Sequence, residues 1–104
     1  IYAILKINLE EGHQMAKSGT KMAAKLNNLQ LVSYNLNSRG LLFKAQEAYD
    51  SAVYYLKRSI EVAQQAEDLA VIGYNKILLG EVMLATGRLS EAERLFREAE
   101  EECM

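Results

Sequence analysis

The chain has 104 residues, a formal net charge of −2 at pH 7, no proline and one cysteine. This length is that of one domain or a piece of one, and the absence of a basic surplus argues against a nucleic-acid-binding protein, which needs Lys and Arg to neutralise phosphates. Half of the residues are hydrophobic and a quarter are charged, which is typical of a folded globular protein and argues against intrinsic disorder.

The same composition bounds the fold class and the compartment. A β-rich domain of this size spends more turn residues on its hairpins than the six glycines present here, so we expect an all-α protein. No apolar run approaches the roughly 18 residues of a membrane span, and the first residues become acidic too soon for a secretory signal. Cys103 cannot form an internal disulfide, which favours a reducing compartment, and we expect the protein to be cytoplasmic.

The first residues predict a helical stub over 1–7, followed by a longer helix over 10–26. The chain begins with Ile inside an apolar stretch, so we expect a fragment of a longer protein. An uncovered apolar end would pack on a preceding helix or, in the fragment, support self-association. The residues of this end are Ile1, Tyr2, Ile4 and Leu5.

Residues 21–35, KMAAKLNNLQLVSYN, and residues 61–75, EVAQQAEDLAVIGYN, are nearly the same sequence forty positions apart. A fixed period of this kind indicates stacked repeats. The aligned identities are Ala23 with Ala63, Leu29 with Leu69, Tyr34 with Tyr74, Asn35 with Asn75, Gly40 with Gly80, Ala45 with Ala85 and Ala52 with Ala92. The same shift run backward places Leu9, Gly12, Ala16 and Gly19 in a first copy. We therefore expect a single domain over 1–104, with a partial first repeat at 1–26 and further repeats at 27–66 and 67–104.

Each full copy predicts two helices, at 29–46 and 50–66 and again at 69–86 and 90–103, and their short loops make neighbouring helices antiparallel. Asn28 and Asp68 are expected to be N-caps. The second helices are expected to begin at Asp50 and Ser90, and Ser90 with Glu93 matches a capping box. Gly87 can supply a left-handed turn before the last helix, whereas Glu47 at the equivalent position predicts a turn of different construction.

Small residues recur at one register of both copies, namely Gly40, Ala52, Gly80 and Ala92. Gly in mid-helix costs about 1 kcal/mol relative to Ala, so its repetition needs a steric reason. Close crossing of the two helices in each copy is that reason.

At these positions the sequence resembles the tetratricopeptide-repeat (TPR) family. The matching residues are Arg39, Gly40, Phe43, Ala52, Leu56 and Ser59, and again Leu79, Gly80, Met83, Ala92, Phe96 and Ala99. The 40-residue period resembles the long-helix variant of the family, found in signalling scaffolds and bacterial transcriptional regulators. A period of this length would equally admit HEAT or armadillo repeats, and the Gly/Ala register favours the TPR family. The resemblance implies antiparallel hairpins stacked as a right-handed superhelix.

The resemblance also implies a non-catalytic protein-interaction module that holds a partner polypeptide in a concave groove, lined by the first helix of each copy. The groove positions would be Tyr34, Asn37, Leu41, Lys44, Tyr74, Ile77, Glu81 and Leu84. The alternative is that these residues pack between copies. The basic groove of chaperone-binding relatives is not matched, because its positions hold Leu41, Tyr74 and Leu78.

A second functional hypothesis is a ligand- or peptide-sensing regulatory domain of a larger signalling or transcription-regulating protein. An enclosed pocket under Tyr34 and Tyr74 would favour the sensor, and an extended groove would favour the scaffold. Asn35 and Asn75 are expected either to hydrogen-bond across copies or to contact a ligand.

An enzyme has little support in this sequence. His13 is the one histidine and is expected to be exposed or to pack, and Cys103 has no second Cys or His nearby. The acidic last helix is expected to form the solvated pairs Glu93–Arg97 and Arg94–Glu98. We expect no catalytic residue, metal or cofactor, and no nucleic-acid or membrane partner.

Overall fold

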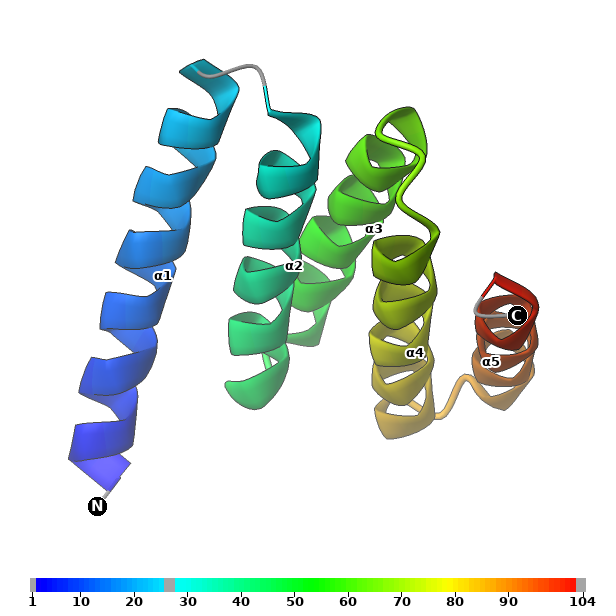
Figure 1. Ribbon diagram of the computed structural model, residues 1–104. Coiled ribbons are helices and arrows are strands. Elements are labelled where there is room, and N and C mark those ends of the chain that lie inside the picture. Colours follow the sequence, from blue (N-terminus) through cyan, green and yellow to red (C-terminus); the bar gives the residue numbers. More distant parts are fainter. Residues whose placement is uncertain (1, 26–27, 103–104) are drawn as a thin grey trace.

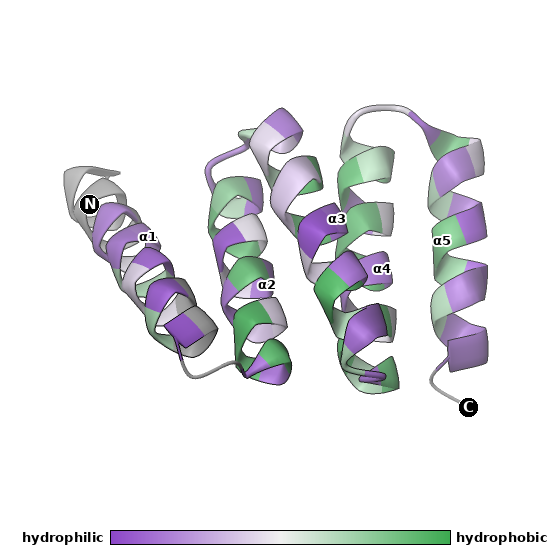
Figure 2. Ribbon diagram, turned by 90° about the horizontal axis from the view of Figure 1, so that it is seen from above, coloured by the Kyte–Doolittle hydropathy of each residue, from purple (hydrophilic) through white to green (hydrophobic). Residues whose placement is uncertain are grey.

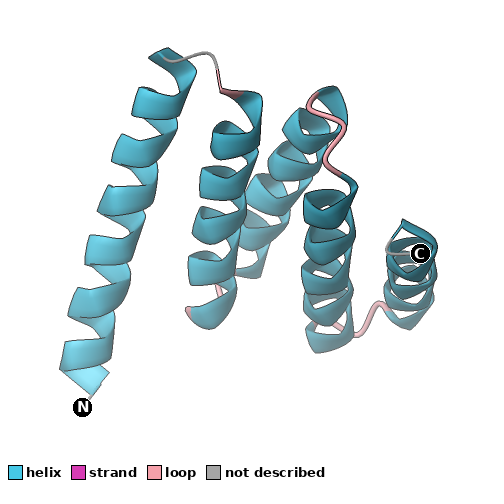
Figure 3. Cartoon of the chain, in the orientation of Figure 1, coloured by secondary structure: helices cyan, strands magenta, loops and turns pink. Residues whose placement is uncertain are grey.

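The structure is a computed structural model that describes residues 2–25 and 28–102, with side chains from residue 10 onward except those of residues 20, 23 and 24. The described chain forms five helices: α1 (Tyr2–Lys25), α2 (Leu29–Ala45), α3 (Tyr49–Gln65), α4 (Leu69–Ala85) and α5 (Leu89–Glu102) (Figure 1). Within these residues there is no strand, and Figure 3 shows helices joined by short loops. The predicted all-α class is confirmed.

The helices stack in chain order. α2 pairs with α3 and α4 pairs with α5, while α1 lies beside α2 (Figure 1). Among the described residues α1 contacts α2 alone and α5 contacts α4 alone, whereas α2 and α4 also touch each other directly. The molecule measures 36 × 34 × 19 Å, and its smallest dimension is that of two helices of about 10 Å each. The fold is therefore a plate two helices thick.

The 40-residue repetition of the sequence is present in the helices. α2 and α4 begin at Leu29 and Leu69, and α3 and α5 begin at Tyr49 and Leu89. Equivalent segments of the two copies therefore adopt equivalent elements.

The helices of each hairpin approach closely at the repeated glycines. A Cβ added at Gly40 would lie 2.7 Å from the side chain of Leu56, and one added at Gly80 would lie 2.6 Å from the ring of Phe96. Leu56 and Phe96 are themselves equivalent residues of the two copies. A side chain at either glycine would push the paired helix away, which explains why glycine recurs at this register.

Three turns close by the same hydrogen-bond pattern. Their left-handed residues are Glu47 (φ 59°), Glu67 (φ 55°) and Gly87 (φ 80°). The next residue donates its N–H to a carbonyl five positions back, from Ala48 to Phe43 at 2.9 Å, from Asp68 to Ala63 at 3.0 Å and from Arg88 to Met83 at 2.7 Å. This is the Schellman motif. The prediction of a different turn at Glu47 is wrong, because these bonds hold Glu47 left-handed despite a cost of about 1–2 kcal/mol.

The predicted N-caps of α2 and α4 are confirmed. Asn28 Oδ1 accepts from the N–H of Leu31 at 3.1 Å, and Asp68 Oδ1 accepts from the N–H of Val71 at 3.2 Å. Each oxygen satisfies a backbone donor that the first turn of a helix leaves unpaired.

The predicted caps of α3 and α5 are wrong. Both helices begin one residue earlier than Asp50 and Ser90, so Ser90 and Glu93 form no capping box. Ala48 is the N-cap of α3 and makes no side-chain cap bond. Ala48 completes the Schellman turn of α2 as Asp68 does that of α3, but alanine has no side-chain oxygen to accept a cap hydrogen bond. Asp50 instead lies in the first turn of α3, where its negative charge interacts favourably with the partial positive charge of the helix N-terminus.

Residues 2–25 form one helix instead of the predicted stub and second helix. α1 runs without interruption from Tyr2 to Lys25. Neither a proline nor a turn sequence separates the two predicted segments, and one mid-helix Gly12 costs only about 1 kcal/mol. Ile1 and Cys103 lie outside the described residues, as do the side chains of Tyr2, Ile4 and Leu5, so self-association through this end stays a prediction.

The core lies between α3, α4 and α5. Its buried residues are Ala52, Leu56, Leu78, Leu79, Val82, Met83, Ala92 and Leu95. Figure 2 shows α4 as green over much of its length, whereas α5 is mostly purple. α4 is therefore the more buried helix of the second hairpin, and α5 is amphipathic. No helix of the described chain is both long and apolar enough to cross a membrane.

Candidate functional site

Two tyrosines from equivalent positions of the repeats flank a hollow between α2 and α4. Tyr34 is 60% exposed and Tyr74 is 47% exposed. The hollow has a volume of about 320 Å³ and is lined by Tyr34, Asn37, Ser38, Leu41, Ala70, Val71 and Tyr74. Each helix presents one turn after another to this space, because residues three and four apart lie on one helix face.

This hollow adjoins two others. Toward the start of α2 and α4 it shares Tyr34 and Val71 with a hollow that Leu31 and Asp68 also line. Toward α1 it shares Ser38 and Leu41 with a hollow that Met15 also lines. The three hollows are therefore adjacent to one another across α1, α2 and α4, and together we call them the tyrosine groove.

The tyrosine groove exposes apolar side chains over its whole length. The exposed fraction is 75% for Met15, 40% for Leu31 and 39% for Leu41. Together with the two tyrosines, these side chains form a contiguous apolar surface, and such surfaces on folded proteins mark binding sites more often than isolated exposed residues do.

Of the eight predicted groove residues, Tyr34, Asn37, Leu41 and Tyr74 line this groove. Lys44 and Glu81 instead pair with each other across α2 and α4, with Nζ 2.7 Å from Oε2. Ile77 and Leu84 are exposed on α4, outside the three hollows. The groove is thus shorter than the predicted set, and none of Lys44, Ile77, Glu81 and Leu84 lines it.

Asn37 differs from the groove residues beside it. Its side chain is 6% exposed, so it is largely buried in the wall instead of projecting from the surface. Asn37 Nδ2 donates to Asn75 Oδ1 on α4. A spacing of three from Tyr34 correctly puts Asn37 on the same face, but the hydrogen bond to the next repeat draws it inward.

Asn75 belongs to a buried hydrogen-bond network that links α2, α3 and α4. Asn75 Nδ2 donates to Ser59 Oγ at 2.8 Å, and the Ser59 hydroxyl donates to the carbonyl of Ser33 at 2.6 Å. Asn75, Ser59 and Ser33 are all fully buried. Burying polar groups without partners is costly, so a complete network favours this one register of stacking. Asn35 behaves differently, since its amide donates to Leu31 of its own helix at 2.8 Å.

Several residues that line the groove are not among those predicted from the sequence. Ser38 lies four residues after Tyr34, and Val71 lies three residues before Tyr74. The same helical spacing that selects the tyrosines would have selected both, although nothing in the sequence indicates that Met15 of α1 continues the groove.

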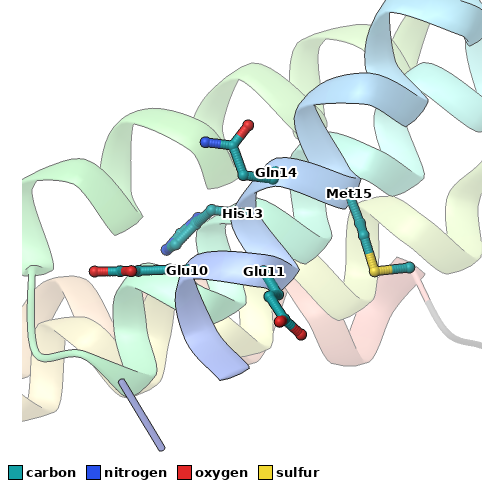
Figure 4. A pocket seen from close by; sticks show the side chains of 5 residues that line it. All are labelled: Glu10, Glu11, His13, Gln14 and Met15. Carbon is teal, nitrogen blue, oxygen red and sulfur yellow. The ribbon is translucent and has the colours of Figure 1, made fainter. Parts of the chain in front are cut away.

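A further hollow runs along α1 and is lined by Glu10, Glu11, His13, Gln14 and Met15 (Figure 4). Residues this close in sequence span more than a full helical turn, and the labelled side chains point in different directions. Glu10, His13 and Gln14 share one helix face by their spacing, whereas Glu11 and Met15 lie on another, so the five side chains do not converge on one ligand. His13 packs on Phe43 with ring centroids 4.2 Å apart, and its Nε2 lies 2.7 Å from Gln46 Oε1, as a packing residue would.

The remaining charged cluster joins α4 to α5. Lys76 Nζ lies 3.2 Å from Glu98 Oε1 and also pairs with Glu102, and its side chain is 12% exposed. Burial by itself lowers the pKa of Lys76, but the hydrogen bonds to Glu102 and Glu98 outweigh it and raise the pKa above its ordinary value. Burial likewise raises the pKa of Glu98, and its bonds to Lys76 and Arg94 outweigh that effect and lower it. The predicted pairs Arg94–Glu98 and Glu93–Arg97 are present at 2.5 and 3.7 Å.

Within the described residues, no group of three or more His, Cys, Asp or Glu side chains is placed so that it could hold a metal ion.

The stacked hairpins, with glycine at each crossing and a groove along their first helices, define a TPR module, a class that generally mediates protein interactions. The model of one family, described as the SusR N-terminal TPR domain, matches residues 20–103. The chain belongs to this family, and the predicted TPR resemblance is confirmed. Searches among curated proteins and among solved structures gave no match.

Proposed function

We propose that this chain is a non-catalytic module that binds an extended polypeptide segment in the tyrosine groove. The observation that carries the proposal is the row of three adjacent hollows, which share the lining residues Tyr34, Val71, Ser38 and Leu41. A row of open hollows suits a segment of several residues better than a compact ligand, which binding proteins usually enclose.

The two tyrosines are the proposed anchors. A tyrosine ring buries a large area while losing little rotamer freedom, and it keeps a hydroxyl for a hydrogen bond. Tyr34 and Tyr74 stand on neighbouring helices on either side of the central hollow, so one segment can contact both rings. Leu41 and Met15 extend the apolar surface toward α1.

Selection from a random dodecapeptide library on the immobilised chain tests the proposal. Selected peptides are expected to bind the Tyr34→Ala/Tyr74→Ala variant at least tenfold more weakly, because aromatic anchors commonly contribute about 2 kcal/mol each. Tyr54→Ala is the matched control, because Tyr54 is 56% exposed on α3 and lies outside the groove. Equal binding to the double variant, with helical circular dichroism unchanged, would contradict the proposal.

A regulatory sensor is the second candidate function, and the family description supports it to the extent that an N-terminal domain is one part of a larger protein. In this case the occupant would be a compact ligand in the central hollow alone. The extent of amide chemical-shift changes separates the two. A peptide occupant is expected to shift residues around Met15 and Leu31 as well as Tyr34, whereas a compact ligand would shift only those around Tyr34 and Tyr74.

We further propose, from the amino-acid composition, that the protein acts in the cytoplasm, which cell fractionation of the full-length protein would test.

A further inference from the structure

The hydrogen-bond network beneath the groove has a fixed direction. The carbonyl of Ser33 can only accept, so the hydroxyl of Ser59, 2.6 Å away, must donate its one proton there. Ser59 Oγ must then accept from Asn75, which turns the amide nitrogen of Asn75 toward Ser59 and its oxygen toward Asn37. Asn37 therefore donates through Nδ2 and keeps its own Oδ1 as an acceptor in the groove wall.

A second polar group of the groove wall is also an acceptor. The hydroxyl of Ser38 donates to the carbonyl of Tyr34 at 3.1 Å, which uses its proton and leaves oxygen lone pairs toward the central hollow. The wall between the two tyrosines thus offers acceptors from Asn37 and Ser38. Groups that donate hydrogen bonds, such as backbone N–H, ammonium and guanidinium, are the complementary ligands.

The charge of the groove also favours a cationic ligand. Asp68 is the one charged residue among the described residues that line the three hollows. One of its oxygens caps α4 at Val71 N, and the carboxylate remains at the edge of the groove. The two basic residues of α2 are both engaged elsewhere, because Arg39 lies over the ring of Tyr55 at 4.5 Å and Lys44 pairs with Glu81 at 2.7 Å.

The starts of α2 and α4 at this end each carry roughly half a positive charge, which by itself would attract an anion. One donor of each helix start is already used, because Asn28 takes the N–H of Leu31 and Asp68 takes that of Val71. An incoming carboxylate would meet the negative charge of Asp68 in hollows that no Lys or Arg lines, whereas an incoming cation would meet a carboxylate and two tyrosine rings.

We propose that the groove selects an extended peptide segment in which an Arg or Lys stands among apolar residues, the cation reaching Asp68 beside Tyr34 while the apolar side chains cover Leu41 and Met15. This inference rests on the proposed function and adds the chemistry of its partner. It distinguishes the groove from one that captures an acidic segment or a free C-terminal carboxylate, for which Lys or Arg would have to line the wall.

The groove-dependent peptides from the dodecapeptide selection test this inference. They are expected to be enriched in Arg or Lys and depleted in Asp and Glu. Replacing the selected basic residue of one such peptide by Gln should weaken binding about threefold to fivefold, the range of a partly exposed ion pair. The same replacement should have no effect on binding to Asp68→Asn, and the loss for the unmodified chain should shrink in about 0.5 M NaCl.

Asp68→Asn is a suitable variant because Asn is as good an N-cap as Asp, so α4 keeps its first turn. Glu67→Gln is the charge-matched control, because it removes the adjacent negative charge outside the groove and should behave like the unmodified chain. Groove-dependent peptides that are neutral or acidic would overturn this inference and leave the binding function standing. If no selected peptide depends on Tyr34 and Tyr74, both the binding function and this inference fail.

Discussion

Asn75 of α4 donates to Ser59 of α3 across a 2.8 Å hydrogen bond, and both side chains are fully buried. Three helices meet at this bond, because Ser59 also reaches the backbone of α2 and Asn75 accepts from Asn37. A slip of one turn between the two hairpins would leave these polar groups unpaired in a dry interior. The network therefore fixes how one repeat stacks on the next.

Asn75→Ala is expected to lower the free energy of unfolding by about 2–3 kcal/mol, because it leaves buried polar partners unsatisfied and opens a small cavity. Urea denaturation followed by circular dichroism measures this loss. Asn35→Ala is the control from the preceding repeat and should cost less than about 1 kcal/mol, since the Asn35 bond is local and exposed. The Asn75→Ala/Ser59→Ala double variant should lose about 1 kcal/mol less unfolding free energy than the sum of the losses of the two single variants. Simple additivity would mean that the two residues act independently.

Alanine at the repeated glycines is expected to destabilise the protein in a defined order. At Gly40 the added Cβ meets Leu56, which is fully buried and cannot move aside, so the loss should be about 2–3 kcal/mol. At Gly80 it meets the tip of the Phe96 ring, which is only partly buried, and the loss should be about 1 kcal/mol.

Gly12 is the control of this series. A Cβ there would lie 3.0 Å from the flexible end of Leu42, and the better helix propensity of alanine should make Gly12→Ala neutral or stabilising. Thermal unfolding of the three variants gives the order. A loss at Gly12 as large as that at Gly40 would show that helix contact is not the reason for glycine at this register.

Glycine at the left-handed turns is expected to stabilise the fold. Glu47→Gly and Glu67→Gly remove the cost of a Cβ at positive φ, and part of that gain is offset by the extra freedom of glycine in the unfolded chain. Each variant should gain about 0.5–1 kcal/mol of unfolding free energy. Gly87→Ala should lose about 1 kcal/mol at the equivalent position. A fall in stability for both Glu variants would mean that these side chains stabilise the turns in another way.

The Lys76 cluster is expected to make stability depend on pH. The pKa of Glu98 lies below its ordinary value of 4.5, so its contribution is complete above that pH and is lost as the pH falls through the lowered pKa. The pKa of Lys76 lies above 10.5, so its contribution is complete below that pH and is lost as the pH rises through the raised pKa.

Lys76→Met should therefore lower the free energy of unfolding by about 1 kcal/mol near neutral pH. In acid this difference in unfolding free energy between the variant and the unmodified chain should become smaller. Urea midpoints measured between about pH 3 and pH 7 give this profile. A constant difference over the whole range would show that Lys76 stabilises by packing alone. Arg97→Met is the control, because its pair with Glu93 is exposed at 3.7 Å and should contribute little at any pH.

Local patterns predicted much of the fold. The glycines at 40 and 80, the caps at Asn28 and Asp68 and the spacing of Tyr34 and Tyr74 each follow from interactions within a few residues or from the period itself. The left-handed Glu47 was missed because the hydrogen bonds of its turn outweigh an unfavourable side chain. The inward position of Asn37 was missed because its partner lies 38 residues away, and Lys76 likewise finds its partners 22 and 26 residues later. The repeat boundaries and the partner-binding role of the groove residues stay predictions.

Among residues 2–25 and 28–102, α1 and α5 each contact a single neighbouring helix, and this has a consequence for how a chain of these residues alone unfolds. Loss of either outer helix exposes one face and leaves the rest of the stack in place, so opening begins at the two edges and proceeds inward. Amide protons of α1 and α5 then exchange with solvent before those of α3 and α4, and proteases cut the edges first. The middle of the plate, where the tyrosines stand, is the last part to lose its shape.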